Sequence, residues 1–216
     1  MRKKHFCNFC EIAKGKVAFP EYDRPLFAND AFFAIPSVGA MVEGWMLIIP
    51  RKHCLSMKDM YDDPRFFEMM HCVYAVLKEV YGNVVMFEHG CAKEGSLTGC
   101  GANHAHVHLL PFKESLIEDL GDSGFCWERC LASEISEIVG SDEYLFYSDL
   151  DEDGDLSDVL GFVHVLRNET SQFFRRVIAK RLGMEMFYDY KKYLFLESVS
   201  RGIKKISDNK LLAENA

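Results

Sequence analysis

The sequence predicts an α+β fold in which an antiparallel sheet packs against a helix. Residues 30–38 and 44–53 are short runs of aromatic and branched side chains interrupted by a proline, which is typical of β-strands. Residues 63–82 place apolar side chains at helical spacing between a proline near the start and a glycine at the end. Two further strands are expected at residues 83–90 and 104–110, and a glycine-rich loop separates them. The order strand, strand, helix, strand, strand favours an α+β layer.

Composition limits the classes of function that the chain can have. Its 216 residues suffice for one large or two small domains, and 49% hydrophobic with 27% charged residues is typical of a soluble globular protein. The net charge of -8 argues against nonspecific nucleic-acid binding. The basic start "MRKKHFCNFC" leads into no apolar export signal, so we expect a cytoplasmic protein with reduced thiols and no membrane contact.

Residues 114–216 are expected to form a C-terminal α/β extension of unknown role, separate from a domain at residues 1–113. Helices are predicted at residues 114–120 and 127–140, with Cys126 and Cys130 one helical turn apart. Residues 141–167 suggest a hairpin around an acidic turn that resembles an EF-hand loop, although position 12 of that loop is a leucine. A capping-type start and a final glycine predict a helix at residues 168–183. Its basic residues in "FFRRVIAK" could contact phosphates, but a solvated face is the default interpretation.

Three histidines on alternate residues stand out in "GANHAHVHLLP". In a strand, His104, His106 and His108 project to one side, while the small and apolar residues between them face the other. A neutral imidazole is both a nucleophile and a metal ligand near pH 7. The spacing therefore leaves two interpretations open: a catalytic row, or a zinc site formed by the histidines themselves.

A single CxxC, formed by Cys7 and Cys10, is a moderate zinc signal near the N-terminus. A tetrahedral site needs two more ligands, and the chain has no second CxxC. Histidines must therefore complete such a site if it forms.

These residues resemble the histidine triad (HIT) superfamily of nucleotide hydrolases and transferases. The family pattern is His-x-His-x-His followed by apolar residues, which "HAHVHLL" matches. "CNFCEIAKGK" is similar to the N-terminal segment of the zinc-containing branch, which is related to dinucleoside polyphosphate hydrolases and galactose-1-phosphate uridylyltransferases. "EGWMLIIPRKHCLSM" is similar to the family strand that ends in proline, two mostly basic residues and histidine. The resemblance covers roughly residues 6–113.

The resemblance implies a metal site and a catalytic row. Cys7, Cys10, His53 and His104 match the ligands of a structural zinc ion, and a closed set of four leaves no position for water. His106 matches the nucleophile that attacks the α-phosphorus and forms a nucleotidyl-histidine, with its other ring nitrogen held by a backbone carbonyl. His108 would donate to phosphate oxygens.

Substrate contacts are predicted less directly, because the chain departs from the family at several positions. Ser37 stands where the family has an acid or amide for the ribose, and Glu43-Gly44-Trp45 replaces the usual proline-glycine-histidine. The loop before the triad, which carries Asn103, is longer than usual. Glu88 or His89 is a candidate contact for the leaving group.

The resemblance thus implies a nucleotide-conjugate hydrolase acting at the α-phosphate, with a small-molecule nucleotide as partner and a homodimer as the expected assembly. Dinucleoside polyphosphates, nucleoside phosphoramidates and nucleotide sugars are the candidate substrates. Three alternatives remain: a nucleotidyltransferase with phosphate or a sugar phosphate as acceptor, a nucleotide-binding regulatory protein, and a zinc hydrolase that uses the triad as its metal site.

Overall fold

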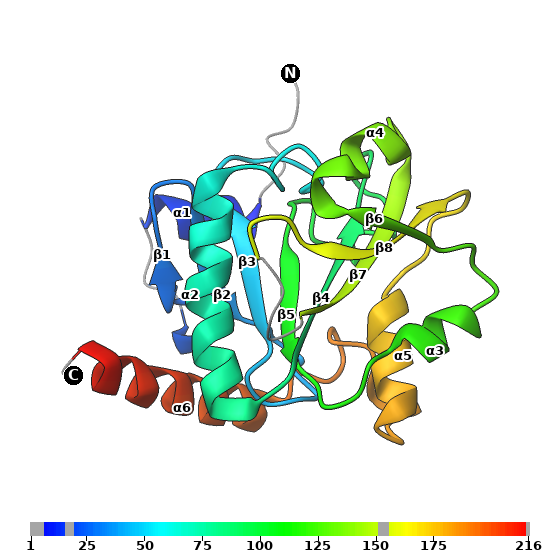
Figure 1. Cartoon of the computed structure of the whole chain (residues 1–216). Helices are drawn as coiled ribbons and strands as arrows, with labels where there is room; N and C mark the ends of the chain where they lie inside the picture. Colours follow the sequence, from blue (N-terminus) through cyan, green and yellow to red (C-terminus); the bar gives the residue numbers. More distant parts are fainter. Residues whose placement is uncertain (1–6, 16–19, 151–155, 215–216) are drawn as a thin grey trace.

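One antiparallel sheet of eight strands organises the molecule (Figure 1). The computed structural model describes residues 7–15, 20–150 and 156–214. The strand order across the sheet is β1-β2-β3-β5-β4-β7-β8-β6, and every neighbouring pair is antiparallel. The predicted α+β class with an antiparallel sheet is therefore confirmed. The strands are β1 (Phe27–Ala28), β2 (Phe32–Pro36), β3 (Met46–Pro50), β4 (Val84–Gly90), β5 (Val107–Pro111), β6 (Glu128–Leu131), β7 (Glu143–Leu150) and β8 (Leu160–Leu166).

Six α-helices and three short 3-10 helices accompany the sheet among the described residues. The long helix α2 begins where the Asp63 side chain accepts a hydrogen bond from the Arg65 amide at 2.9 Å, and Gly82 ends it with a φ of 91°. The helices are α1 (Asn8–Lys14), α2 (Pro64–Tyr81), α3 (Ile117–Gly121), α4 (Ile135–Val139), α5 (Phe173–Arg181) and α6 (Leu196–Glu214), with 3-10 turns at Glu21–Asp23, Ala132–Glu134 and Glu185–Phe187.

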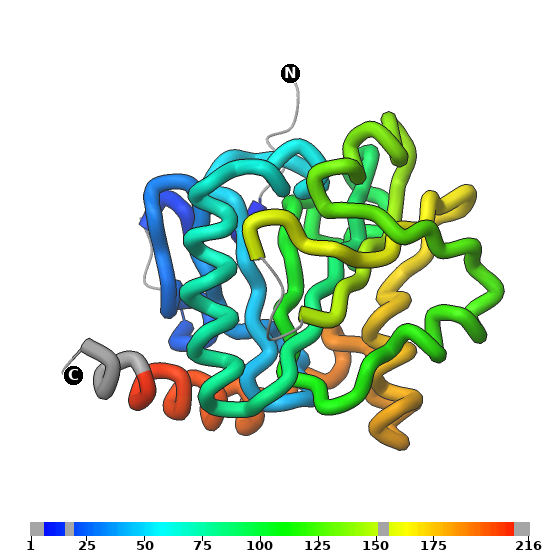
Figure 2. The backbone as a smooth tube through the Cα atoms, in the orientation of Figure 1, coloured from blue at the N-terminus to red at the C-terminus, as the bar shows by residue number. Residues whose placement is uncertain are grey.

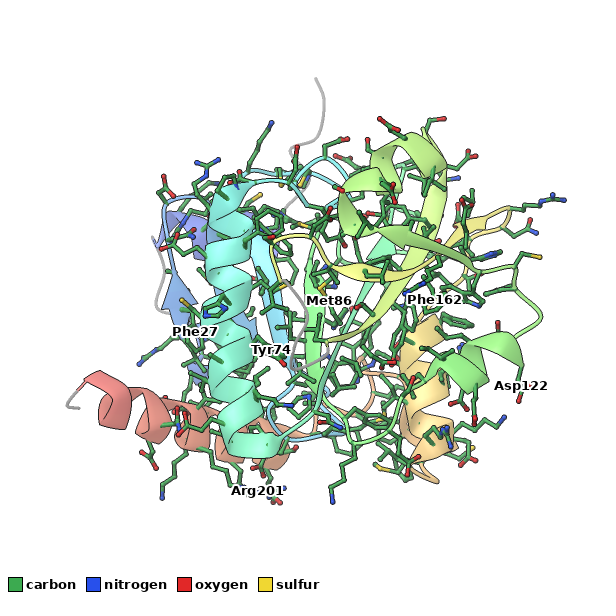
Figure 3. The ribbon with its side chains drawn as sticks, in the orientation of Figure 1. Phe27, Tyr74, Met86, Asp122, Phe162 and Arg201 are labelled. Carbon is green, nitrogen blue, oxygen red and sulfur yellow. The ribbon has the colours of Figure 1, made fainter. Side chains whose placement is uncertain are left out.

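Helices cover both faces of the sheet and so create two hydrophobic layers. On one face, α2 and α4 enclose a core with β-sheet residues; Tyr74 of α2 and Met86 of β4 lie in this layer, whereas Asp122 and Arg201 lie on the outer surface (Figure 3). On the other face, α3 and α5 pack over the middle of the sheet, and α1 packs over its β2–β3 side. His106 and His108 of the predicted histidine row lie toward this second face.

The sheet runs without interruption from the first half of the chain into the second. β7 pairs with β4 from Val84 to Gly90, and β8 and β6 extend the sheet beyond it. After α5 the chain crosses below the sheet to α6, which packs against α2 (Figure 2). Residues 114–216 thus share the sheet and the cores of residues 1–113, and the division at residue 113 stays a prediction from sequence.

The helix predicted at residues 127–140 is wrong in its first part. Residues Glu128–Leu131 form β6, which pairs with β8, and only Ile135–Val139 form an α-helix. Pairing with a neighbouring strand overrides the local helical pattern here. Cys130 is consequently a buried strand residue, and Cys126 precedes the strand rather than lying one helical turn away.

The helix predicted at residues 168–183 begins later than expected. Its residue before the first turn is Gln172, which has a φ of 53° and makes no capping hydrogen bond through its side chain. The polar residues that suggested a cap are used elsewhere, since Glu169 accepts the Leu97 amide at 3.0 Å. The hairpin of β7 and β8 is as predicted, while the acidic turn between them falls on residues 151–155, outside the described part of the chain.

Among the described residues, no helix has both the length and the apolar character needed to cross a membrane.

Candidate active site and metal centre

A cavity of about 360 Å³ opens on the sheet face that carries α1 and α5. This volume is in the range of small-molecule binding sites. Residues Cys7–Phe9 form one wall, residues 99–103 form a second, and Arg175 and Tyr190 form a third. The four histidines in its lining are His89, His104, His106 and His108. The cavity is therefore lined both by the predicted site residues of the first half of the chain and by side chains from the second half.

The histidine row lies only partly on a strand. β5 begins at Val107, so His108 is a strand residue, whereas His104 and His106 precede the strand. The Ala105 amide donates to the Cys54 carbonyl at 2.8 Å and holds this preceding segment in place. The prediction of a strand from residue 104 is therefore wrong for its first three residues, although all three histidines line the same cavity.

His106 is held by its own backbone. Its Nδ1 lies 2.9 Å from the His104 carbonyl oxygen, so Nδ1 carries the proton and Nε2 keeps a free lone pair. The enclosed position of the ring lowers the pKa of His106 below its ordinary value. This side chain is thus a neutral imidazole with one fixed tautomer, which is the state required of a nucleophile.

His108 is held in the opposite tautomer. The Nε1–H group of Trp45 donates to His108 Nδ1 at 3.0 Å, which leaves the ring proton on Nε2. The ring also stacks on Phe87 with the centroids 4.4 Å apart, and burial keeps the pKa of His108 well below its ordinary value. His108 is therefore a neutral hydrogen-bond donor through Nε2. Trp45 is the residue that sets this state.

Cys7, Cys10, His53 and His104 form a cluster that could hold a metal ion, since their candidate ligand atoms all lie within 4.8 Å of one another. His104 Nδ1 lies 3.2 Å from Cys7 Sγ and 3.3 Å from His53 Nδ1, and Cys10 Sγ lies 3.3 Å from His53 Nδ1. Ligand bonds of about 2.0 to 2.3 Å in a tetrahedron place the donor atoms at about these separations. Two thiols and two imidazoles at this spacing fit such an ion.

A further hydrogen bond orients His104 toward the cluster. Its Nε2 lies 2.8 Å from the Pro50 carbonyl oxygen, so Nε2–H donates and Nδ1 is left for the metal. Burial lowers the pKa of His104 to about 4, which keeps the ring neutral as a ligand must be. The carbonyl of His104 also accepts the hydrogen bond from His106, and the cluster is thereby linked to His106 through one residue.

The remaining predicted contacts divide into those that line the cavity and one that does not. Ser37, Asn103 and His89 all line it. Glu88 does not, because alternate residues of β4 face opposite sides of the sheet and Glu88 faces the α2 layer. There its carboxylate accepts hydrogen bonds from the Tyr61 and Tyr144 hydroxyls at 2.5 Å and 2.6 Å. It also accepts the Met57 amide at 2.7 Å. Glu88 is a buried structural group, and His89 is the candidate substrate contact.

No site residue was predicted from sequence in the second half of the chain. Arg175 lines the cavity and is only 3% exposed, whereas the default interpretation of its helix placed the basic residues in solvent. Tyr190 lines the cavity as well, and its hydroxyl donates to the Cys100 carbonyl at 2.8 Å. The apolar neighbours of Arg175 in "FFRRVIAK" were the available signal, because they show that one side of this helix is buried.

Comparison with known proteins gives distant structural likenesses. No protein-family model matches the chain, and no curated protein matches it. A Hit-like protein involved in cell-cycle regulation from Bartonella henselae is similar at 18% identity and a TM-score of 0.39, over 53% of this chain and 82% of that one. A HIT family hydrolase from Clostridium thermocellum has 18% identity and a TM-score of 0.34, over 52% and 95%. A hypothetical histidine triad nucleotide-binding protein from Sulfolobus tokodaii has 17% identity and a TM-score of 0.36, over 94% and 97%.

Proposed function

We propose that the chain is a HIT-type hydrolase that cleaves nucleotide conjugates at the α-phosphate through a nucleotidyl-histidine intermediate. The observation that carries this proposal is the contact of 2.9 Å between His106 Nδ1 and the His104 carbonyl, which leaves Nε2 unprotonated beside a ligand-sized cavity. A neutral imidazole with a fixed tautomer needs no base to remove a proton before it attacks phosphorus.

The reaction has two steps in this proposal. His106 Nε2 forms a bond to the α-phosphorus while the bond from phosphorus to the leaving group breaks, with its electron pair going to the leaving group. His108 Nε2–H donates to a phosphate oxygen and stabilises the charge that develops there. Water then attacks the same phosphorus, the histidine nitrogen departs with its electron pair, and the proton lost by water goes to solvent.

Substrate contacts come from residues that line the cavity around this row. Ser37 is buried beside Val38, and its hydroxyl reaches the backbone carbonyl of Val38 at 3.4 Å, so it is placed to exchange that weak bond for a ribose hydroxyl. The side-chain oxygen of Asn103 accepts the Gly95 amide at 2.8 Å, which leaves the NH2 group for a substrate oxygen. These contacts support nucleotide binding in the cavity, with Ser37 in place of the family's acid or amide.

Zinc is the ion that we propose for the cysteine and histidine cluster. Two thiolates and two imidazoles suit zinc, and all four positions of a tetrahedron are filled by side chains. Bound zinc would therefore serve as a structural link that pins the N-terminal segment to the residues just before β5. No step at phosphorus requires it. The three triad rings have separate partners, His104 in the cluster, His106 on a carbonyl and His108 on Trp45, which disfavours a single metal site made from the triad.

The test is turnover of diadenosine tetraphosphate, adenosine 5′-phosphoramidate and UDP-glucose, the last with and without inorganic phosphate as acceptor. The wild type and His106→Ala are compared in the presence of EDTA. We expect activity that survives EDTA and disappears in the variant, and a requirement for phosphate would identify transfer rather than hydrolysis. Equal activity in both proteins, or none in the wild type, would contradict the proposal.

A further inference from the structure

Arg175 is a buried cation with no role in the two proposed reaction steps. Its side chain is 3% exposed and lines the cavity. The guanidinium donates through Nε to the Tyr188 carbonyl at 2.9 Å and through Nη2 to the Gly39 carbonyl. Two carbonyls engage two of its five N–H groups and supply no negative charge. A buried charge normally has an ionic partner, because its desolvation is costly.

Within the described residues, Arg175 has no such partner. Among the described residues no carboxylate lies at ion-pair distance from it. Asp189, the one carboxylate whose charge raises the pKa of Arg175, accepts hydrogen bonds from the Gln172 side chain and the Lys191 amide, both at 3.2 Å. Two aromatic rings take the place of an acid: the guanidinium carbon lies 4.6 Å from the centre of the Trp45 ring and 5.6 Å from that of Tyr190. These contacts position the charge without neutralising it.

The cavity as a whole is suited to anions, although the protein is acidic. The described residues that line it include four histidines and one arginine but no aspartate or glutamate. The ammonium group of Lys191 lies beside Gly101, which lines the cavity. In addition, the Phe174 amide donates to His89 Nε2 at 3.5 Å, which leaves the proton of His89 on Nδ1 as a further donor.

Arg175 lies at the His108 end of the catalytic row. It packs on Trp45, and the same indole donates to His108. The metal cluster is at the other end, where His104 meets Cys7. A group bound by Arg175 is therefore next to the part of the substrate that His108 serves, and away from the metal cluster.

We propose that Arg175 binds the leaving phosphate of the substrate and thereby makes the enzyme select conjugates whose leaving group is phosphate. This inference rests on the proposed function and names its substrate class. When His106 attacks, the bond between the α-phosphorus and the bridging oxygen breaks, and the electron pair stays on that oxygen as added negative charge. A buried guanidinium stabilises this charge strongly. A phosphoramidate instead releases a neutral amine, because its nitrogen takes up a proton from solvent as the bond to phosphorus breaks, and it gives Arg175 no such charge to bind.

The test compares Arg175→Gln with the wild type on diadenosine tetraphosphate and on adenosine 5′-phosphoramidate. We expect kcat/KM for the tetraphosphate to fall by about 100-fold and that for the phosphoramidate to change by less than about 3-fold. Arg175→Lys keeps the positive charge but lacks the planar N–H donors of the guanidinium. It should therefore hydrolyse the tetraphosphate faster than Arg175→Gln but more slowly than the wild type. Arg176→Gln is the matched control, because Arg176 is the exposed neighbour on the same helix and stacks on Tyr188 at 3.9 Å.

Equal losses on both substrates, or no loss on either, would overturn the proposal. A binding measurement separates its failure from that of the proposed function. Inorganic pyrophosphate is titrated calorimetrically into the wild type, Arg175→Gln and His106→Ala. We expect the wild type and His106→Ala to bind pyrophosphate with similar affinity. Arg175→Gln should bind it at least about 10-fold more weakly. If the wild type turns over neither substrate, the hydrolase assignment fails, and unchanged pyrophosphate affinity in Arg175→Gln would then overturn the anion site as well.

Discussion

The two walls of the cavity differ in how they are encoded. The α1 wall carries Cys7, and Cys10 follows it within α1; the spacing of the two cysteines predicts a metal site from four residues of sequence. The α5 wall carries Arg175 of α5 and Tyr190 of the segment that follows this helix. Neither residue belongs to a motif, and both line the cavity because this part of the chain packs over the sheet. The spacing of residues along the chain can therefore predict a site whose residues are close in sequence. A site residue that comes from a distant helix is identified only from the three-dimensional structure.

The largest expected effect concerns the row between the two walls. His106→Ala removes the nucleophile and should lower kcat by at least about 1000-fold, measured as release of nucleoside monophosphate. His71→Ala is the control, because His71 is an exposed residue of α2 on the far face of the sheet. Comparable losses in both variants would show that the effect is one of folding.

The motif-bearing wall is tested by Cys7→Ser. Loss of one thiol should lower the zinc content from about one ion per chain by roughly tenfold and the thermal midpoint by about 5 to 10 °C, since metal binding contributes to folding. Elemental analysis and thermal unfolding measure the two effects. Cys72→Ser, at an exposed thiol of α2, should change neither. Full zinc content in Cys7→Ser would remove this residue from the ligand set.

Trp45 connects the catalytic row to the α5 wall, and its replacement should have an intermediate effect. Trp45→Phe removes the N–H group that donates to His108 Nδ1 at 3.0 Å, so the ring is free to exchange tautomers. We expect kcat to fall about 10-fold, with a change in the nitrogen chemical shifts of His108. Trp127→Phe is the control, as Trp127 donates to the Leu120 carbonyl instead. An unchanged tautomer in Trp45→Phe would contradict the assigned role.

The smallest effect on activity is expected at Glu88. Burial raises its pKa to about 7, whereas an unfolded glutamate titrates near 4.5. A carboxyl whose pKa is raised in the folded state contributes stability below the unfolded value and loses it as the pH rises through the folded value. The free energy of unfolding of the wild type, relative to Glu88→Gln, should therefore fall between pH 4.5 and about pH 7. Denaturant titrations at several pH values measure this difference.

Glu88→Gln also tests which of Glu88 and His89 on β4 contacts the substrate. Glu88→Gln should change KM by less than about 3-fold, because the carboxylate faces the α2 layer and not the cavity. A large rise in KM would return Glu88 to the substrate site.

The sequence predicted the central strands and α2 because their signals are local. Asp63, Pro64 and Gly82 mark the ends of α2, and apolar runs mark β2, β3 and β4. It did not predict β6, whose hydrogen bonds depend on β8, thirty residues away in the chain. It also gave no indication of α6, although Val199, Ile203 and Ile206 recur at helical spacing and are buried against both layers.

For the candidate site, the resemblance grouped Cys7, Cys10, His53 and His104 because each lies in a recognisable segment, and the structure brings their candidate ligand atoms within 4.8 Å of one another. Their role as zinc ligands stays a prediction. The tautomers of His106 and His108 were less accessible, since they depend on a backbone carbonyl and on an indole 63 residues away. The choice of His89 over Glu88 required the register of β4, because a shift of one residue exchanges the two faces.

The central claim is that His106 Nε2 attacks phosphorus, and trapping the intermediate tests it most directly. The protein is mixed with diadenosine tetraphosphate carrying ³²P at both α-phosphates, quenched in alkali within milliseconds to seconds, and digested for mass spectrometry. The account predicts one acid-labile, alkali-stable adenylyl group on the peptide that contains residues 104–108, carried by His106 and absent from His106→Ala. Labelled adenosine monophosphate formed with no protein-bound label, at a rate equal in both proteins, would contradict it.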